Sequence, residues 1–383
     1  KNPPEKRPPP PPYQALQKTP ADEEKFEYYT MEEVKHIDLN GNISDFLPAA
    51  IYRSLTFSPD GNYLLVQTIR KPYSYQVPVS RFPVSYDIYS RSGNLVTNFY
   101  NRPLQENIPN GFDAVETGRR SVAWRSDVPA TLTWAEAQDG GDPAVESAIR
   151  DRVYQLEAPF SGKPAMLAAL RNRFSGVNWG NSKLAVVFDY WWKNRNVVTY
   201  LIDPSQENET PGILYDRSSE DYYGEPGDFL TMKNNFGSYV LRTSSDGKKL
   251  YLQGEGYSPE GNRPFLDEFD IRSHKTRRLW QADGLETYES IVRVMDPLKK
   301  TMITSVEGKT RNPNYYLRTA NKLKALPSFP NPYASFMNVS KQRIRYKRAD
   351  GVDLSATLYL PAGYDSVRDG RLPLLMWAYP VEY

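Results

Sequence analysis

One pattern occurs five times along the sequence: an alternating apolar segment, a polar turn, and a second alternating segment. The first copy, LTFSPDGNYLLVQT at residues 55–68, places Ser-Pro-Asp-Gly between two runs of β-forming residues. Pro fixes φ, Asp binds its own backbone, and Gly accepts positive φ, so this tetrapeptide predicts a tight turn. The other copies lie at residues 121–136, 175–190, 238–254 and 290–306. A chain organised in this way is predicted to be mainly β.

Each copy is followed by a further strand pair around a polar turn. These pairs lie at residues 85–99, 151–167, 197–216, 264–280 and 314–326. The four-strand unit therefore recurs about every 50 to 67 residues. Radially stacked four-stranded sheets, the blades of a β-propeller, are the architecture that this period predicts. A series of unrelated hairpins or a large sandwich is the alternative, and the regular spacing argues against it.

The pattern changes after the fifth unit. Residues 342–365 read as two alternating strands around a turn at 349–351, and the apolar run LPLLMWAY follows at 372–379. A hairpin leading to an all-apolar buried strand is how a mostly parallel sheet begins. We therefore predict three parts: a Pro-rich linker and connector at 1–44, propeller blades at 45–335, and the truncated start of a second domain at 336–383. Within the connector, residues 21–34 are predicted to form a short helix or an irregular segment.

Composition excludes several classes of function. A net charge of +2, with 48 basic residues among 46 acidic ones, does not supply the field that nucleic acid needs. No apolar run approaches the roughly 20 residues that cross a bilayer. Because the chain has no Cys, a thiol nucleophile, a disulfide and a thiolate metal site are excluded. With only two His, we do not expect a His-based metal site or triad contained wholly in this chain. We expect His36 and His274 to be solvated, and we predict no metal and no cofactor.

Acidic residues offer two further possibilities. Asp139 and Asp142 in QDGGD are the one pair that suits a propeller glycosidase, although their spacing with two Gly residues is typical of a turn. The loop DRSSEDYYGEPG can bind an amino terminus or a cation, or cap backbone N–H groups in a blade loop. Its carboxylates belong to Asp216, Glu220, Asp221 and Glu225.

Six blocks, in order along the chain, resemble the prolyl oligopeptidase family of serine peptidases, and within it the glutamyl endopeptidase branch. The blocks are RKPYSYQVPVSRFP, TLTWAEAQDGGD, LYDRSSEDYYGEPG, SPEGNRPFLDEFDI, RYKRADGVDLSATLYLPAGYD and LPLLMWAYPVEY. In this family a propeller caps an α/β-hydrolase domain. The resemblance implies that five blades of a total of seven or eight are visible here, followed by the first strands of the hydrolase domain.

The resemblance also implies a role for Tyr379. It aligns with the family tyrosine whose phenol O–H helps form the oxyanion hole. The family's nucleophile lies on a G-x-S-x-G elbow, and no such pattern occurs among these residues. The triad Asp and His follow the nucleophile in the family order. We therefore expect this segment to be inactive by itself and to need the remainder of its own polypeptide.

The family's activity implies a peptide substrate in the form of oligopeptides or unfolded chains, with cleavage after Glu as one expectation. Selection for an acidic side chain requires a cation, and the first block offers Arg70, Lys71 and Arg81. Solvated loop charges or ion pairs between blades are the alternative for these residues. A non-catalytic propeller scaffold in a surface or periplasmic complex is the alternative function. We expect a periplasmic or secreted bacterial location, with the plastid as the alternative.

Overall fold

The computed structural model describes residues 13, 16–109, 111–207, 210–284, 286–309 and 311–378. These residues form 25 strands, one α-helix and three short 3₁₀ segments, so the predicted mainly β class is confirmed. The strands join into antiparallel sheets that follow the order of the chain. The Pro-rich segment at 1–12 lies outside the described residues.

The one α-helix of the described residues, α1 (Pro20–Thr30), overlaps the segment 21–34 and begins one residue before it. Thr19 caps its first turn, and Asp22 binds back to the Thr19 backbone in a capping box. Pro20 at the first helical position is compatible with the start of a helix because its missing N–H would have no partner there. The helix ends before β1 (Glu32–Ile37), a strand that the sequence pattern did not indicate.

The first sheet has the order β1-β2-β3-β4-β5, with one strand more than the predicted four. Its other members are β2 (Ile43–Phe57), β3 (Tyr63–Ile69), β4 (Val84–Ser90) and β5 (Leu95–Arg102). The predicted turn joins β2 to β3: Gly61 has φ +71° and its N–H donates to the Ser58 carbonyl at 2.8 Å. The Asp60 carboxylate accepts from the Ser58 hydroxyl and from the Asn62 backbone, which fixes the turn.

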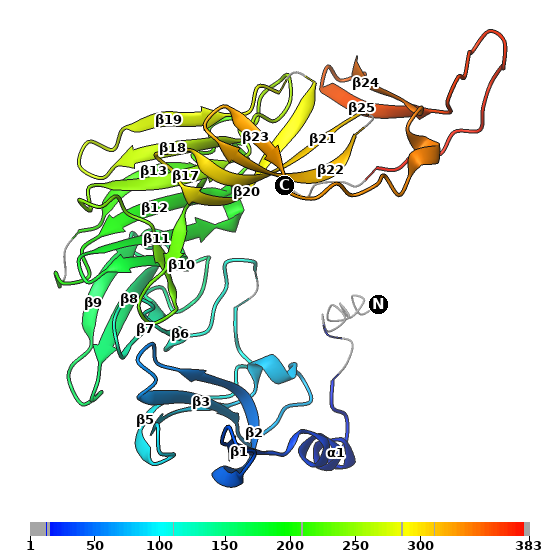
Figure 1. Ribbon diagram of the computed structural model, residues 1–383. Helices are drawn as coiled ribbons and strands as arrows, with labels where there is room; N and C mark the ends of the chain where they lie inside the picture. Colours follow the sequence, from blue (N-terminus) through cyan, green and yellow to red (C-terminus); the bar gives the residue numbers. More distant parts are fainter. Residues whose placement is uncertain are drawn as a thin grey trace, which may run out of the picture. The chain divides into compact units, whose positions relative to one another are not determined.

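The second and third sheets repeat the four-stranded plan. The second contains β6 (Arg120–Trp124), β7 (Thr131–Ala137), β8 (Asp151–Glu157) and β9 (Ala165–Leu170). The third contains β10 (Arg173–Asn181), β11 (Leu184–Trp191), β12 (Asn196–Ile202) and β13 (Gly212–Ser218). Figure 1 shows the three sheets following one another in chain order.

The sheets stack face to face through two apolar cores. Ile88 of the first sheet and Leu132 and Trp134 of the second belong to one cluster and are almost fully buried. Val153 of the second sheet and Val187 of the third belong to the next. Each sheet thus covers the face of its neighbour, which is how propeller blades bury apolar surface without closing each sheet on itself. The predicted blade architecture accounts for these contacts.

The structure divides into two compact units, and the division falls within the fourth sheet, β14-β17-β18-β19. This sheet contains β14 (Asp228–Phe229), β17 (Lys249–Gly254), β18 (Phe265–Asp270) and β19 (Thr276–Gln281). The predicted pairing within residues 238–254 is wrong in part. The first strand, β16 (Tyr239–Leu241), pairs with β15 (Thr231–Lys233). The chain just after β16 meets the second strand at the bridge of Thr243 with Leu250. Met232 and Val240 pair across this ribbon.

The second unit contains one complete four-stranded sheet and one hairpin. The sheet has β20 (Thr287–Asp296), β21 (Thr301–Gly308), β22 (Arg311–Thr319) and β23 (Lys322–Ala325). The predicted hairpin is formed by β24 (Ser340–Lys347) and β25 (Asp353–Leu360), with Gly351 at φ +90° in the turn.

The predicted buried strand at 372–379 is not seen in residues 372–378, which lack strand structure. The side chains of Leu374, Leu375, Met376 and Trp377 are 76 to 94% exposed. A strand of a parallel sheet needs hydrogen-bonding neighbours on both edges and cover on both faces. None of the described strands pairs with this run, so the condition for burying it is not met.

Candidate functional site

The loops that carry the first two sequence blocks meet at one end of the first three sheets. This loop end comprises residues 70–83, 103–119, 138–150, 171–172 and 192–195. All of these loops lie at the same end of the strands, because successive antiparallel strands reverse direction. Hydrogen bonds join the loops: Arg102 donates to the carbonyls of Ser80 and Phe82, and Arg173 donates to the Asp113 carbonyl at 2.8 Å.

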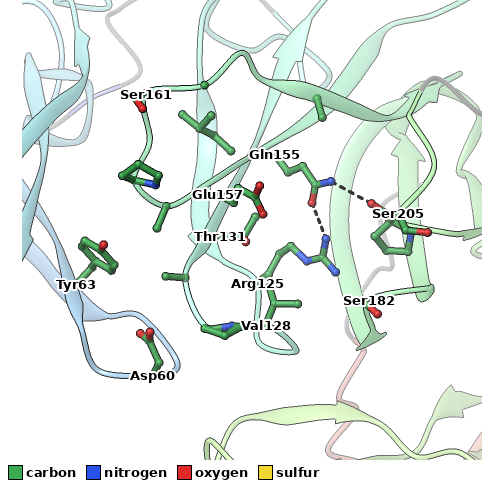
Figure 2. A pocket seen from close by; sticks show the side chains of 18 of the residues that line it. Asp60, Tyr63, Arg125, Val128, Thr131, Gln155, Glu157, Ser161, Ser182 and Ser205 are labelled. Carbon is green, nitrogen blue, oxygen red and sulfur yellow. Dashed lines mark hydrogen bonds between the residues drawn. The ribbon is translucent and has the colours of Figure 1, made fainter.

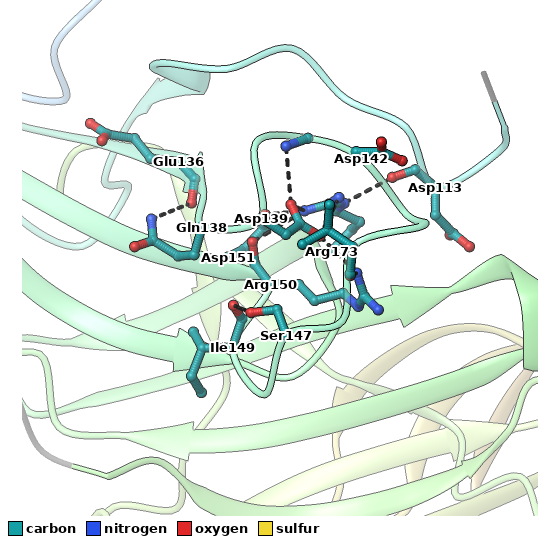
Figure 3. Close-up of polar contacts among 12 residues, drawn as sticks. Asp113, Glu136, Gln138, Asp139, Asp142, Ser147, Ile149, Arg150, Asp151 and Arg173 are labelled. Carbon is teal, nitrogen blue, oxygen red and sulfur yellow. Dashed lines mark hydrogen bonds and ion pairs between the residues drawn. The ribbon is translucent and has the colours of Figure 1, made fainter. Parts of the chain in front are cut away.

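A buried network of charges holds the centre of the loop end (Figure 3). Arg173 donates through both terminal nitrogens to the two oxygens of Asp139, each at 2.8 Å. Arg150 donates to the same carboxylate at 2.7 Å. Asp151 pairs with Arg120 and Arg173 and accepts from the Phe174 backbone. Each charge in the network thus has a counter-charge, which is what burial of ionic groups requires, although Arg120 Nε is buried without a hydrogen bond to any described residue.

The environment changes the acidity of two members of this network. Burial opposes ionisation of Asp139, but hydrogen bonds from Arg173 and Arg150 outweigh it and hold the pKa of Asp139 below its ordinary value. Burial, and then the neighbouring charge of Arg173, lower the pKa of Arg120 to about 10. Ion pairing and burial thus account for both shifts, and the network serves to hold the loops in position.

The glycosidase pair lies in a turn, as its spacing indicates. Asp139 accepts from the Gly141 N–H at 3.0 Å and Asp142 accepts from the Ala144 N–H at 2.9 Å. Because Asp139 is also bound by two arginines, it cannot act as the acid or nucleophile that glycoside cleavage needs.

The three predicted cations lie in or beside the β3–β4 loop. Arg70 is 57% exposed and its Nη2 lies 3.9 Å from Asp87. Lys71 is 60% exposed, and its Nζ lies 2.7 Å from a carboxylate oxygen of Glu27 on α1. The Arg81 guanidinium lies 5.4 Å from the ring centroid of Tyr13. The structure brings none of them into contact with another, and their role in substrate binding stays a prediction.

The acidic loop binds mainly to its own neighbours. Asp216 pairs with Arg171 at 2.5 Å, Glu220 accepts from Arg195 at 3.1 Å, and Asp221 caps the Gly224 N–H at 2.9 Å. Glu225 belongs to the second unit, where it lines a cavity of about 250 Å³. Capping and ion pairing therefore account for three of the four carboxylates.

Arg119 is a candidate that the sequence did not single out. Its guanidinium lies 4.4 Å from the ring centroid of Phe99 and 4.8 Å from that of Trp134. It donates to the Phe99 carbonyl at 2.7 Å and keeps 27% of its side chain exposed. Stacking on aromatic rings preorganises an arginine for an anionic ligand. The adjacent Arg120 is buried, and the doublet Arg119-Arg120 gives no sign of which residue faces solvent.

A cavity of about 840 Å³ lies at the opposite end of the same sheets (Figure 2). Arg125 is buried there, and it donates to Asp127 and to Gln155, which in turn donates to the Pro204 carbonyl. Tyr63 from the first sheet and Glu157 from the second also line the wall. The polar groups of Arg125 and Gln155, which line this cavity, thus already have hydrogen-bond partners within the protein.

The remaining sequence predictions concern the two histidines, metal binding, membrane spans and Tyr379. His36 and His274 are exposed. Among the described residues, no three His, Cys, Asp or Glu side chains gather in a way that suits a metal ion. No helix in the described part of the chain has the length and apolar character to cross a membrane. Tyr379 lies outside the described residues.

Stacked four-stranded antiparallel sheets followed by a hairpin define this chain as propeller-type. A scan against protein-family models finds no match. The "probable glutamyl endopeptidase, chloroplastic" of Oryza sativa subsp. japonica is 40% identical over 386 residues, 97% of this chain and 41% of that protein. Its namesake in Arabidopsis thaliana is 39% identical over 387 residues, 97% of this chain and 40% of that protein. The chain thus spans about two fifths of the length of these relatives.

Solved structures show a weaker likeness. An acylaminoacyl peptidase of Pyrococcus horikoshii is 14% identical, with 86% of this chain and 47% of that chain covered at a TM-score of 0.42. Oligopeptidase B of Leishmania major is 8% identical, with 82% and 46% covered at 0.39. The curated relatives confirm the resemblance: 97% of this chain aligns at 39 to 40% identity with two proteins named as probable glutamyl endopeptidases.

Proposed function

We propose that this chain is the propeller and hydrolase-entry segment of a serine peptidase. The observation that carries the proposal is 40% identity over 97% of the chain to a protein named as a glutamyl endopeptidase. The stacked sheets support it, because they match the propeller that the family places over its hydrolase domain. The chain spans two fifths of those relatives, so the activity proposed is that of the whole protein.

The proposed reaction is hydrolysis of a peptide bond through an acyl-enzyme. A serine attacks the scissile carbonyl, a histidine accepts the serine proton, and the same histidine returns a proton to the leaving amine. Water then cleaves the ester. The proposal assigns this triad to residues beyond the present sequence, in which no G-x-S-x-G pattern occurs. The segment by itself is accordingly proposed to be inactive.

Tyr379 is the residue of this chain that we propose for the chemistry. Its phenol O–H would donate to the oxygen that becomes negative in the tetrahedral intermediate. Arg70, Lys71 and Arg81 are proposed to face an acidic substrate side chain. In support, Lys71 and Arg70 are more than half exposed at the loop end, where they are accessible to a ligand. Cleavage after Glu is the finer proposal, and the names of the relatives favour it.

Replacement of Tyr379 by Phe tests the proposal in the full-length protein. Loss of one oxyanion donor lowers kcat by about 10²–10³. We expect KM for a fluorogenic Glu peptide to stay unchanged, because the hydrogen bond strengthens only in the transition state. Tyr359→Phe, at an exposed position of β25, is the matched control and should retain full activity.

A second measurement distinguishes the proposed serine peptidase from the alternative, a non-catalytic propeller scaffold. A fluorophosphonate probe should label one serine of the full-length protein. Absence of labelling, together with absence of hydrolysis of Glu and Gln peptides, would favour the non-catalytic scaffold.

A plastid location is supported by the names of both relatives, whereas the periplasmic or secreted location stays an untested prediction.

A further inference from the structure

A carboxylate of α1 occupies the most accessible of the predicted cations. Glu27 Oε1 lies 2.7 Å from Lys71 Nζ and accepts from the Tyr73 hydroxyl at 2.9 Å. The Lys71 ammonium also lies 5.6 Å from the Tyr73 ring centroid. An ammonium and a phenol that converge on one carboxylate form a charge-assisted pair of hydrogen bonds.

The loop side of this contact is anchored in the core. The Tyr73 ring stacks on Phe82 with centroids 5.3 Å apart, and Phe82 is 1% exposed. The neighbouring Ser74 is 3% exposed, and it donates to Glu106 and accepts from the Gln76 N–H. The position of the Tyr73 hydroxyl is therefore set by packing within the loop end.

The helix side, in contrast, is weakly held. None of the α1 side chains is buried, and Tyr28 and Tyr29 are 80 and 79% exposed. Its contacts with the loop come from Phe26, which meets Tyr73 and Phe82 edge-on, from Glu27, and from Glu23, which binds the Tyr75 phenol. An 11-residue helix without a buried face has little stability of its own, so it can leave this surface at low cost.

We propose that Lys71 and Tyr73 form a binding site for the carboxylate side chain of a peptide, and that Glu27 occupies it as a displaceable internal ligand. This inference rests on the proposed peptidase function for the identity of the ligand. A rigid site that is filled by a partly exposed carboxylate on a loosely attached helix favours exchange. An incoming Glu or Asp side chain would replace Glu27, and α1 would leave the loop.

Competition between Glu27 and a peptide carboxylate for this site has a measurable consequence. A ligand binds more weakly when its site is free in only a fraction of the molecules. Removal of the Glu27 charge should therefore strengthen binding of an acidic peptide. A half-exposed ion pair supports a gain of about three- to fivefold. A peptide that carries Gln in place of Glu should show no such gain.

The test uses the full-length protein and a labelled tetrapeptide with one Glu and a reduced, uncleavable bond after it. Fluorescence anisotropy gives its affinity without any need for activity. Glu27→Gln should raise the affinity about three- to fivefold, and Lys71→Met should lower it by a similar factor. Neither change should alter the affinity of the Gln peptide. Glu24→Gln, on the same helix but exposed, is the matched control and should have no effect.

Hydrogen exchange of the α1 amides provides the second readout. Glu27→Gln, or saturation with the Glu peptide, should speed exchange in α1, whereas Glu24→Gln should not. Unchanged affinity of the Glu peptide in Glu27→Gln, or equal gains for both peptides, would overturn the proposal. If the protein cleaves Glu peptides but gives either of these results, the proposed function stands and the proposed site is wrong. If it cleaves no peptide but shows the expected changes in affinity and exchange, the proposed site stands and the proposed function is wrong.

Discussion

Replacement of Asp139 by Ala is expected to destabilise the propeller unit strongly. The Asp139 carboxylate is fully buried and accepts two hydrogen bonds from Arg173, one from Arg150 and one from Gly141. Its removal leaves two arginines near the core without their shared counter-charge. Breaking a buried pair from one side costs about 3–5 kcal/mol, and the four lost contacts favour the upper part of this range.

Chemical denaturation of the full-length protein measures this cost, and hydrogen exchange in β7, β8 and β10 locates it. Local measurement is needed because a protein with several units does not unfold in one step. Asp142→Ala is the control, since its carboxylate accepts only the Ala144 N–H at 2.9 Å, and we expect a loss of about 0.5–1 kcal/mol. Equal losses for the two variants would refute the argument that Asp139 neutralises buried arginines.

Three further expectations follow from the same loops. Gly141→Ala should destabilise the protein by more than about 1 kcal/mol, because a Cβ at φ +76° would lie 2.0 Å from the Val115 carbonyl oxygen. Gly140→Ala, at φ +68° with no atom within 4 Å, should cost less, and comparison of the two unfolding midpoints checks this. The lowered pKa of Asp139 gives stability that is present above its unfolded value of about 4 and is lost as pH falls through the folded pKa. The free energy of unfolding should therefore fall as the pH drops below about 4, and less steeply in Asp139→Asn.

Local patterns in the sequence were sufficient for the turns and most of the strand pairs. The Ser58–Gly61 turn and the hairpin around Gly351 depend on residues a few positions apart, and both are confirmed. The fourth copy shows the limit of such patterns. Its first strand pairs with residues 231–233 instead of the strand that follows it, and two candidate partners of similar character cannot be ranked from local sequence.

The charge network could not be predicted because it is formed by residues from separate loops. Arg173 and Asp139 are 34 residues apart, and each belongs to a stretch that also carries exposed charges. Only the stacking of the second and third sheets brings them together. The sequence did indicate that Lys71 belongs to a functional block, but its partner Glu27 lies on a helix that precedes the first sheet.

The two kinds of charge at the loop end suit different tasks. Arg173 and Arg120 are buried and Arg150 is largely so, and their acidic partners fix all three in place. A buried ion pair adds little net stability compared with an apolar core, but it is satisfied in few geometries and therefore specifies one arrangement of the loops. Lys71 and Arg119 keep exposed surface on this fixed frame. Both groups already face a carboxylate, Glu27 for Lys71 and Glu136 at 3.9 Å for Arg119, so the proposed anionic ligand would replace a side-chain partner while the buried pairs keep the loops in place.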